Sequence, residues 1–200
     1  MKNKKESNSI TAKELMMAGI FTAVYLVIYI VVSIVFGLIP FVANFMLLAD
    51  SIILGIPMML YFAKIKKFGL ILFTYTVAGL VMVILGLGAY SLVAGVICAL
   101  IAELLVKSGD YKSSKKMILG YALCCVGSNA NVVLWKFGGE KYIADTRASM
   151  GDEYVDEVLS YFNIWWVLPA ILLSGFIGGL IGGYLGKKVL RKHFERSGLV

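Results

Sequence analysis

Several polar side chains lie within otherwise apolar stretches of this chain, and they are the residues whose chemistry is most informative. Asp50 follows Asn44 in one apolar run, and Asn129 and Asn131 lie near the end of another. Where such runs cross a membrane, polar groups are costly and usually face the bundle interior or a cavity. Each is therefore a candidate ligand-binding group. The alternative is a hydrogen bond that joins neighbouring helices.

Aromatic residues accompany these polar groups. Asn131 and Trp135 are four residues apart and share one helix face, and Trp165 and Trp166 open a later apolar run. Amides beneath an indole ring are typical of a small-molecule site, in which apolar walls surround a few orienting polar groups. An aromatic belt at the membrane surface is the alternative interpretation. The predicted substrate-binding residues are Asp50, Tyr90, Asn129, Asn131, Trp135, Lys136, Asn163, Trp165 and Trp166.

The ionisable residues within or beside the apolar runs receive specific interpretations. Asp50 or Lys136 would meet a charged substrate group; pairing between the two, or a structural hydrogen bond from Asp50, is the alternative. Glu103 precedes Lys107 by four residues, a spacing that favours an ordinary ion pair on a helix surface. We therefore interpret Glu103 as structural.

The chain shows none of the residue patterns of a catalyst. It has no paired-histidine spacing for a metal, no nucleophile elbow and no phosphate-binding loop. Its three cysteines lie in apolar segments, where we interpret them as small core residues. We therefore predict that the protein is not an enzyme and that it has neither a cofactor nor a metal site. Active transport would then require a motor partner or an ion gradient.

The apolar segments that would position these residues are long enough to cross a membrane. The chain is 60% hydrophobic with a mean hydropathy of +0.87, which excludes an ordinary soluble domain. Thr11 and Glu14 fit a capping box that begins the first segment. We predict an all-α integral membrane protein whose 200 residues form a single membrane domain. Its six transmembrane helices would cover residues 11–38, 42–63, 68–87, 90–106, 117–135 and 163–190.

The last of these segments carries two series of glycines. Each series repeats every fourth residue, so each lines one face of the helix and allows a neighbouring helix to approach closely. The sequence therefore predicts a helix that is clasped on two sides. The two series are Gly175, Gly179 and Gly183, and Gly178, Gly182 and Gly186.

Basic residues are distributed very unevenly over the predicted connections. With six spans, 16 of the 19 lysines and arginines fall on one side of the membrane. The positive-inside rule makes this side cytoplasmic, with both termini, including a tail at residues 1–10 and a basic tail at 191–200. The charge of +7 is thus interpreted as a topology signal and an attraction to anionic lipid, not as a nucleic-acid site. We predict a multi-pass protein of the bacterial plasma membrane.

The longest connection, residues 137–162, would be extracellular. Within it Val155, Val158, Leu159 and Phe162 recur at helical spacing and predict a short amphipathic helix. A helix that covers a pocket as a lid is one interpretation. A helix that rests on the membrane surface is the other.

These features together are similar to a known family. A hydrophobic chain of this length, with six apolar segments and a basic ending from Gly186 to Gly198, resembles the Trep_Strep family. That family is classed among the substrate-binding S components of energy-coupling factor (ECF) transporters. The resemblance implies an ECF S-component-like bundle that captures a vitamin or similar small nutrient in a pocket open to the outside.

The resemblance also implies partners. An S component docks on a transmembrane coupling subunit that is carried by two ATPase subunits, and they supply ATP-driven uptake. Docking uses small residues spaced by four on the first helix, which here are Ala18 and Thr22, or Gly19 and Ala23. A stand-alone secondary transporter, with Asp50 as the coupling group, is the first alternative. A membrane-embedded enzyme and a structural or assembly subunit without a small ligand are the others.

Overall fold

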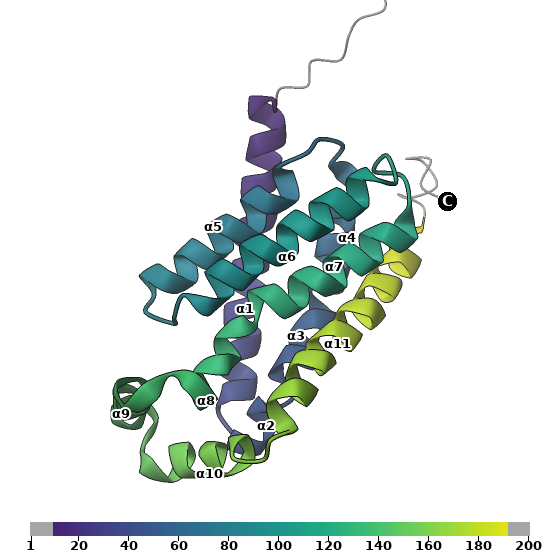
Figure 1. The fold of residues 1–200 in the computed structure, drawn as a ribbon. Coiled ribbons are helices and arrows are strands. Elements are labelled where there is room, and N and C mark those ends of the chain that lie inside the picture. The colour runs from purple at the N-terminus through teal and green to yellow at the C-terminus, as the bar shows by residue number, and fades with distance from the viewer. Residues whose placement is uncertain (1–9, 192–200) are drawn as a thin grey trace, which may run out of the picture.

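The computed structural model describes residues 10–191, which form a bundle of helices without strands in that range (Figure 1). Helix accounts for 83% of the structure. Residues 1–9 of the predicted tail at 1–10 and residues 192–200 of the predicted basic tail at 191–200 lie outside the described residues. The elements are α1 (Ala12–Gly37), α2 (Pro40–Ala43), α3 (Met46–Ile53), α4 (Gly55–Lys64), α5 (Leu70–Ile84), α6 (Tyr90–Lys107), α7 (Ser114–Ser128), η1 (Ala130–Val133), α8 (Leu134–Phe137), α9 (Gly139–Met150), α10 (Asp152–Phe162) and α11 (Val167–Val189).

Helix α1 begins with the predicted capping box. The Thr11 hydroxyl accepts a hydrogen bond from the Glu14 amide at 3.3 Å, and the Glu14 carboxylate accepts one from the Thr11 amide at 2.8 Å. Lys67 pairs with the same carboxylate at 3.0 Å and links α1 to the α4–α5 connection. Only 17% of the most apolar stretch of α1 is buried, so most of this helix faces outward.

The described part of the chain contains four helical stretches long and apolar enough to cross a membrane. They are α1, α6, residues 114–137 and α11; counting the bent pair α3–α4 as one makes five. Helix α5 has 15 residues, or about 22 Å, which is less than the roughly 30 Å of a hydrocarbon core. The structure therefore supports several spans, and the sixth span stays a prediction.

The predicted second span is a broken helix. Helices α3 and α4 meet at Leu54 with a bend of 45°. Pro57 has no amide hydrogen for the carbonyl of Ile53, and its ring would clash with that carbonyl in a straight helix. The proline therefore places the break at Leu54, one helical turn after Asp50 and in the middle of the span.

Neighbouring helices pack closely against two faces of α11, as the glycine spacing predicted. A Cβ on Gly178 would lie 2.7 Å from the Leu48 carbonyl oxygen of α3, and one on Gly179 would lie 2.6 Å from the Ala122 Cα of α7. Gly182 and Gly186 continue the contact with α3 and α4, because each faces their backbone. Backbone contact of this kind fixes α3, α4 and α7 around α11.

Glu103 is structural, but its partner differs from the prediction. Its side chain is fully buried and accepts hydrogen bonds from the amides of Ile71 at 2.8 Å and Leu72 at 3.1 Å. These amides belong to the first turn of α5, which has no partners of its own for them. Lys107 instead lies over the Phe68 ring, 4.9 Å from its centre. The carboxylate therefore joins α6 to the start of α5.

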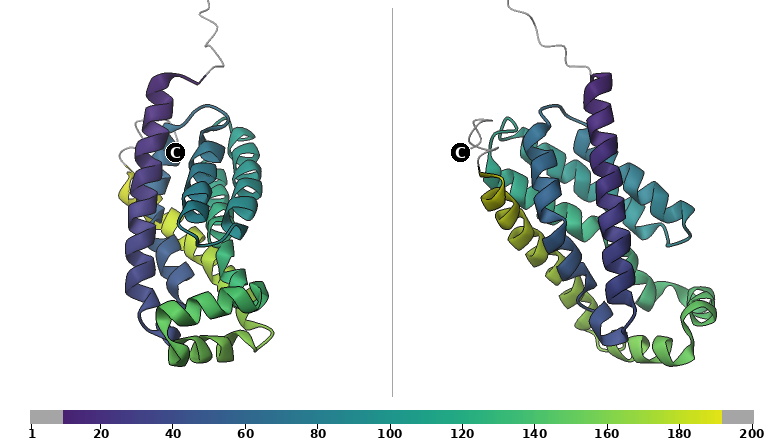
Figure 2. Two further views of the ribbon diagram at one scale, coloured as in Figure 1. Left: turned by 90° about the vertical axis from the view of Figure 1, so that its left-hand side faces the viewer. Right: turned by 180° about the vertical axis from the view of Figure 1, so that it is seen from behind.

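The two ends of the bundle differ. One end holds the start of α1, the α4–α5 and α6–α7 connections and the end of α11 (Figures 1 and 2). We call it the basic end, because most of the lysines lie there. Helices α9 and α10 lie across the opposite end, which we call the α10 end. This separation agrees with the charge pattern, whereas the orientation in the membrane stays a prediction.

Candidate functional site

A cavity of about 740 Å³ lies at the α10 end, between α1, α2, α3, η1, α10 and the α5–α6 turn. Its volume falls within the roughly 300–1,000 Å³ of small-molecule sites. Aliphatic and aromatic side chains form most of its wall, with a few amide and hydroxyl groups among them. The aromatic residues of the wall are Tyr29, Trp135, Tyr142, Tyr154 and Phe162.

Helix α10 covers this cavity. Val155, Val158 and Phe162 are at most 4% exposed, so the apolar face of α10 packs onto the bundle. The Tyr154 hydroxyl donates a hydrogen bond of 2.8 Å to the Gly37 carbonyl at the end of α1. Burial raises the pKa of the Tyr154 phenol above its ordinary value, so the hydroxyl remains a donor. The predicted amphipathic helix is thus present, and its apolar face forms part of the cavity wall; its role as a lid stays a prediction.

An ion cluster joins α10 to the preceding helix. Arg147 of α9 contacts the carboxylate of Asp152 at 3.1 Å and that of Asp156 at 2.5 Å. The two helices meet at Gly151, whose φ of +86° favours glycine. This arrangement holds α9 and α10 together as a hairpin at the surface.

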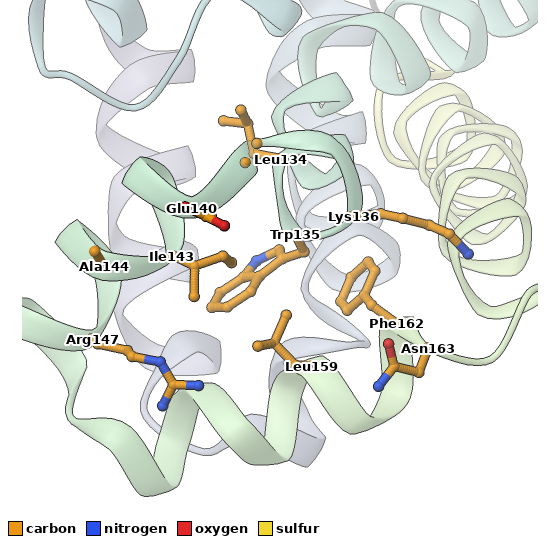
Figure 3. A pocket seen from close by; sticks show the side chains of 12 residues that line it. Leu134, Trp135, Lys136, Glu140, Ile143, Ala144, Arg147, Leu159, Phe162 and Asn163 are labelled. Atoms are coloured by element: carbon orange, nitrogen blue, oxygen red, sulfur yellow. The ribbon is translucent and has the colours of Figure 1, made fainter.

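An aromatic partition separates the cavity from a second hollow. Trp135 stacks on Phe162 with ring centres 6.2 Å apart and meets Tyr142 edge to face at 5.9 Å. The outer hollow, of about 640 Å³, lies on the other side and is lined by Trp135 and Phe162 as well (Figure 3). Lys136 and Asn163, two predicted site residues, line this outer hollow and not the cavity.

Asn129 lies at the floor of the cavity, where α7 ends and a 3₁₀ turn begins. Its Nδ2 donates to the Cys125 carbonyl oxygen at 2.9 Å, while its Oδ1 is buried and has no hydrogen-bond partner. Asp50 lies beside Asn129, is 2% exposed, and also has a buried Oδ1 without a partner. Irregular backbone at membrane depth is tolerated where it is buried or lines a cavity. The breaks after Asp50 and at Asn129 both fit this rule.

Asn131 lines the same cavity, but its polar atoms are engaged. Its Oδ1 accepts from the Ser91 amide at 2.8 Å and its Nδ2 donates to the Gly88 carbonyl at 3.2 Å. In return, the Ser91 hydroxyl accepts from the Asn131 amide at 3.0 Å. These bonds attach the α5–α6 turn, and with it one edge of the cavity, to η1.

The structure does not bring the remaining aromatic predictions into the cavity. Trp165 is 79% exposed, Trp166 is 53% exposed and Tyr90 is 45% exposed. Helix α11 begins only at Val167, so both tryptophans lie in the turn before it and point away from the core. Trp166 lines a separate groove beside Phe41. Of the predicted indole wall, Trp135 alone lines the cavity.

Sequence reasoning missed part of the wall. Tyr29 and Ser33 line the cavity from α1, and Tyr154 and Val158 line it from α10. Each pair is four residues apart and therefore lies on one helix face. The signal was present in α1, where Tyr25, Tyr29 and Ser33 form a polar and aromatic stripe in an otherwise aliphatic segment.

Fold and site together define a multi-pass, all-helical membrane protein with a cavity at the α10 end. The outward faces of α1, α6 and α11 are aliphatic, as contact with lipid requires. The chain belongs to the Trep_Strep family, described as hypothetical bacterial integral membrane proteins, whose family model matches residues 12–196. Searches of curated proteins and of solved structures returned no match.

Proposed function

We propose that the protein is the substrate-binding S component of an ECF-type importer. It would capture a vitamin or similar small nutrient at the extracellular side and pass it to partner subunits for ATP-driven uptake. The observation that carries this proposal is the cavity at the α10 end, which has the volume and mixed wall of a small-molecule site. The basic end would face the cytoplasm, so that the cavity lies on the opposite side of the membrane.

Substrate binding would use the cavity and its lid. Trp135 and Phe162 would contact the apolar body of the substrate, because both line the cavity and stack on each other. Asn129 would orient the substrate, since its amide oxygen is free. Asn131 would act as a positioning residue, because both polar atoms of its side chain already bind the α5–α6 turn.

Docking would use α1. Ala18 and Thr22 are buried in the bundle, where the Thr22 hydroxyl donates to the Ala18 carbonyl at 2.8 Å. Gly19 and Ala23 lie on the exposed side, and a Cβ on Gly19 would meet no atom within 4 Å. We therefore assign Gly19 and Ala23 to the face that approaches the transmembrane coupling subunit, and Ala18 and Thr22 to the protein's own core.

Mass spectrometry of the purified protein after denaturation tests the binding function. A small molecule should be released in near-stoichiometric amount. Ala43→Trp, which fills the cavity, should abolish this release, whereas Ala144→Trp, which fills the outer hollow, should leave it unchanged. Equal release from wild type and Ala43→Trp would remove the cavity as the binding site.

Uptake assays test the partners. Pull-down of the chain should recover a coupling subunit and two ATPases. Gly19→Leu should spare ligand binding and block uptake, while Val93→Leu, at a 60% exposed position on α6, should affect neither. Uptake that survives loss of the ATPases would instead favour a stand-alone secondary transporter, for which Asp50 is the coupling candidate.

A further inference from the structure

Two buried hydrogen-bond acceptors lack donors, one on Asn129 in the cavity wall and one on Asp50 beside it. Asp50 is 2% exposed and Asn129 is 3% exposed, and the Oδ1 atom of each has no partner among the described residues. An unsatisfied buried acceptor destabilises a fold, and such groups are rare enough to require an explanation. A bound molecule that brings an N–H donor into the cavity would satisfy the Asn129 acceptor.

The direction of the Asn129 amide is fixed. Because Nδ2 donates to the Cys125 carbonyl at 2.9 Å, turning the amide over would place two oxygens against each other. The free Oδ1 therefore keeps its position in the cavity floor. Asp50 lies beside the same side chain and one helical turn from Leu47, which also lines the cavity. Asn129 thus gives the cavity wall a polar corner, and the Asp50 carboxylate lies behind it, outside the lining residues.

The rest of the cavity wall favours positive charge. No lysine, arginine or histidine between residues 10 and 191 lines it, since Lys136 and Arg147 line the outer hollow. Five aromatic rings form part of the wall, and the faces of such rings attract cations. An amide oxygen and five aromatic rings form part of this wall, and the Asp50 carboxylate lies behind the amide. With no cation among the described lining residues, this arrangement suits a positively charged guest.

We infer that the cavity takes a ligand with an apolar body and one positively charged group that carries N–H bonds, such as a protonated amine or an amidinium. The charged group donates a hydrogen bond to Asn129 Oδ1 and is attracted by the Asp50 carboxylate behind it, and the apolar body lies against Trp135 and Phe162. This inference rests on the proposed function, because it names the substrate class of the same site.

Three probes with one body and different head groups test this charge preference. We would measure binding of 4-phenylbutylamine, 4-phenylbutanol and 4-phenylbutyrate to the solubilised protein by calorimetry, with protein-free micelles as the blank. The amine should bind at least about tenfold more tightly than the alcohol, and the carboxylate should bind weakest. An amine that binds no better than the alcohol overturns the inference, and so does the absence of binding by all three.

Two variants test whether the Asp50 and Asn129 oxygens cause the preference for the amine. Asp50→Asn and Asn129→Leu should each remove the preference for the amine over the alcohol, while the exposed control Asp145→Asn should keep the wild-type ratio of the two affinities. An unchanged ratio in both floor variants would refute the assignment. If either variant fails to fold, the other decides, and the wild-type probe series stands on its own.

The two proposals fail in distinguishable ways. If the alcohol binds and Ala43→Trp removes that binding, the cavity is a ligand site even when the amine shows no advantage. The charge preference is then wrong and the binding function stands. If Ala43→Trp changes neither probe binding nor the released molecule, the binding function fails as well.

Discussion

Replacing Asn131 by alanine should weaken the fold more than it weakens ligand binding. The substitution removes two side-chain hydrogen bonds, from the Ser91 amide at 2.8 Å and to the Gly88 carbonyl at 3.2 Å. Ser91 is 2% exposed, so its amide would be left buried without a partner, at about 1–3 kcal/mol, and loss of the Gly88 bond adds about 0.5–1.5 kcal/mol. We expect the free energy of unfolding to fall by about 2–4 kcal/mol.

Denaturant unfolding in mixed micelles measures this loss, with a double-mutant cycle as the internal control. The Ser91 hydroxyl bonds the Asn131 amide at 3.0 Å, so Ser91→Ala should cost about 1 kcal/mol. The two changes should be non-additive, because both loosen the same junction between the α5–α6 turn and η1. Hydrogen exchange at residues 88–92 should accelerate in both variants.

Asn129 supplies the contrast for Asn131. Its Nδ2 donates to the Cys125 carbonyl, its side chain also interacts with Asp50, and its Oδ1 is free. Asn129→Leu should therefore lower the free energy of unfolding less than Asn131→Ala does, and it should reduce the amount of bound ligand more. If Asn131→Ala is as stable as the wild type but loses the co-purified molecule tenfold, the reasoning is refuted and Asn131 contacts the ligand directly.

Three further predictions concern packing and the lid. Gly182→Ala should lower the free energy of unfolding by about 3 kcal/mol, because its Cβ would meet the α3 backbone. Gly19→Ala, in open space, should be neutral or stabilising. Unfolding midpoints that shift alike in both variants would contradict this. Glu103→Ala should cost at least about 3 kcal/mol, because it leaves two amides of α5 unpaired, and should raise hydrogen exchange at residues 70–73. Tyr154→Phe should weaken the lid by about 1 kcal/mol and speed release of bound ligand about fivefold in a dilution assay, so an unchanged release rate would exclude this hydrogen bond from lid closure.

Local patterns in the sequence predicted the parts of the fold that depend on neighbours along the chain. The capping box at Thr11, the two glycine faces of α11 and the amphipathic α10 each follow from spacing within a single helix. The lysine distribution likewise predicted which connections share one end of the bundle. Hydrophobic length alone could not distinguish the 15-residue α5 from a full span, because apolar residues continue into the turns on either side of it.

The site depended on contacts between segments far apart in the chain, and only the tertiary structure decided it. Sequence placed Asn129, Asn131, Trp165 and Trp166 at one depth, but depth does not determine direction. Because α11 begins only at Val167, both tryptophans lie in the preceding turn and are exposed. The side-chain amide of Asn131 is hydrogen-bonded to the backbone near the α5–α6 turn. Composition and periodicity thus determined a helical membrane protein, because burial in lipid acts on each segment separately. Which polar atoms stay free for a ligand was decided by how the helices pack, because a hydrogen bond to a distant residue leaves no pattern along the chain.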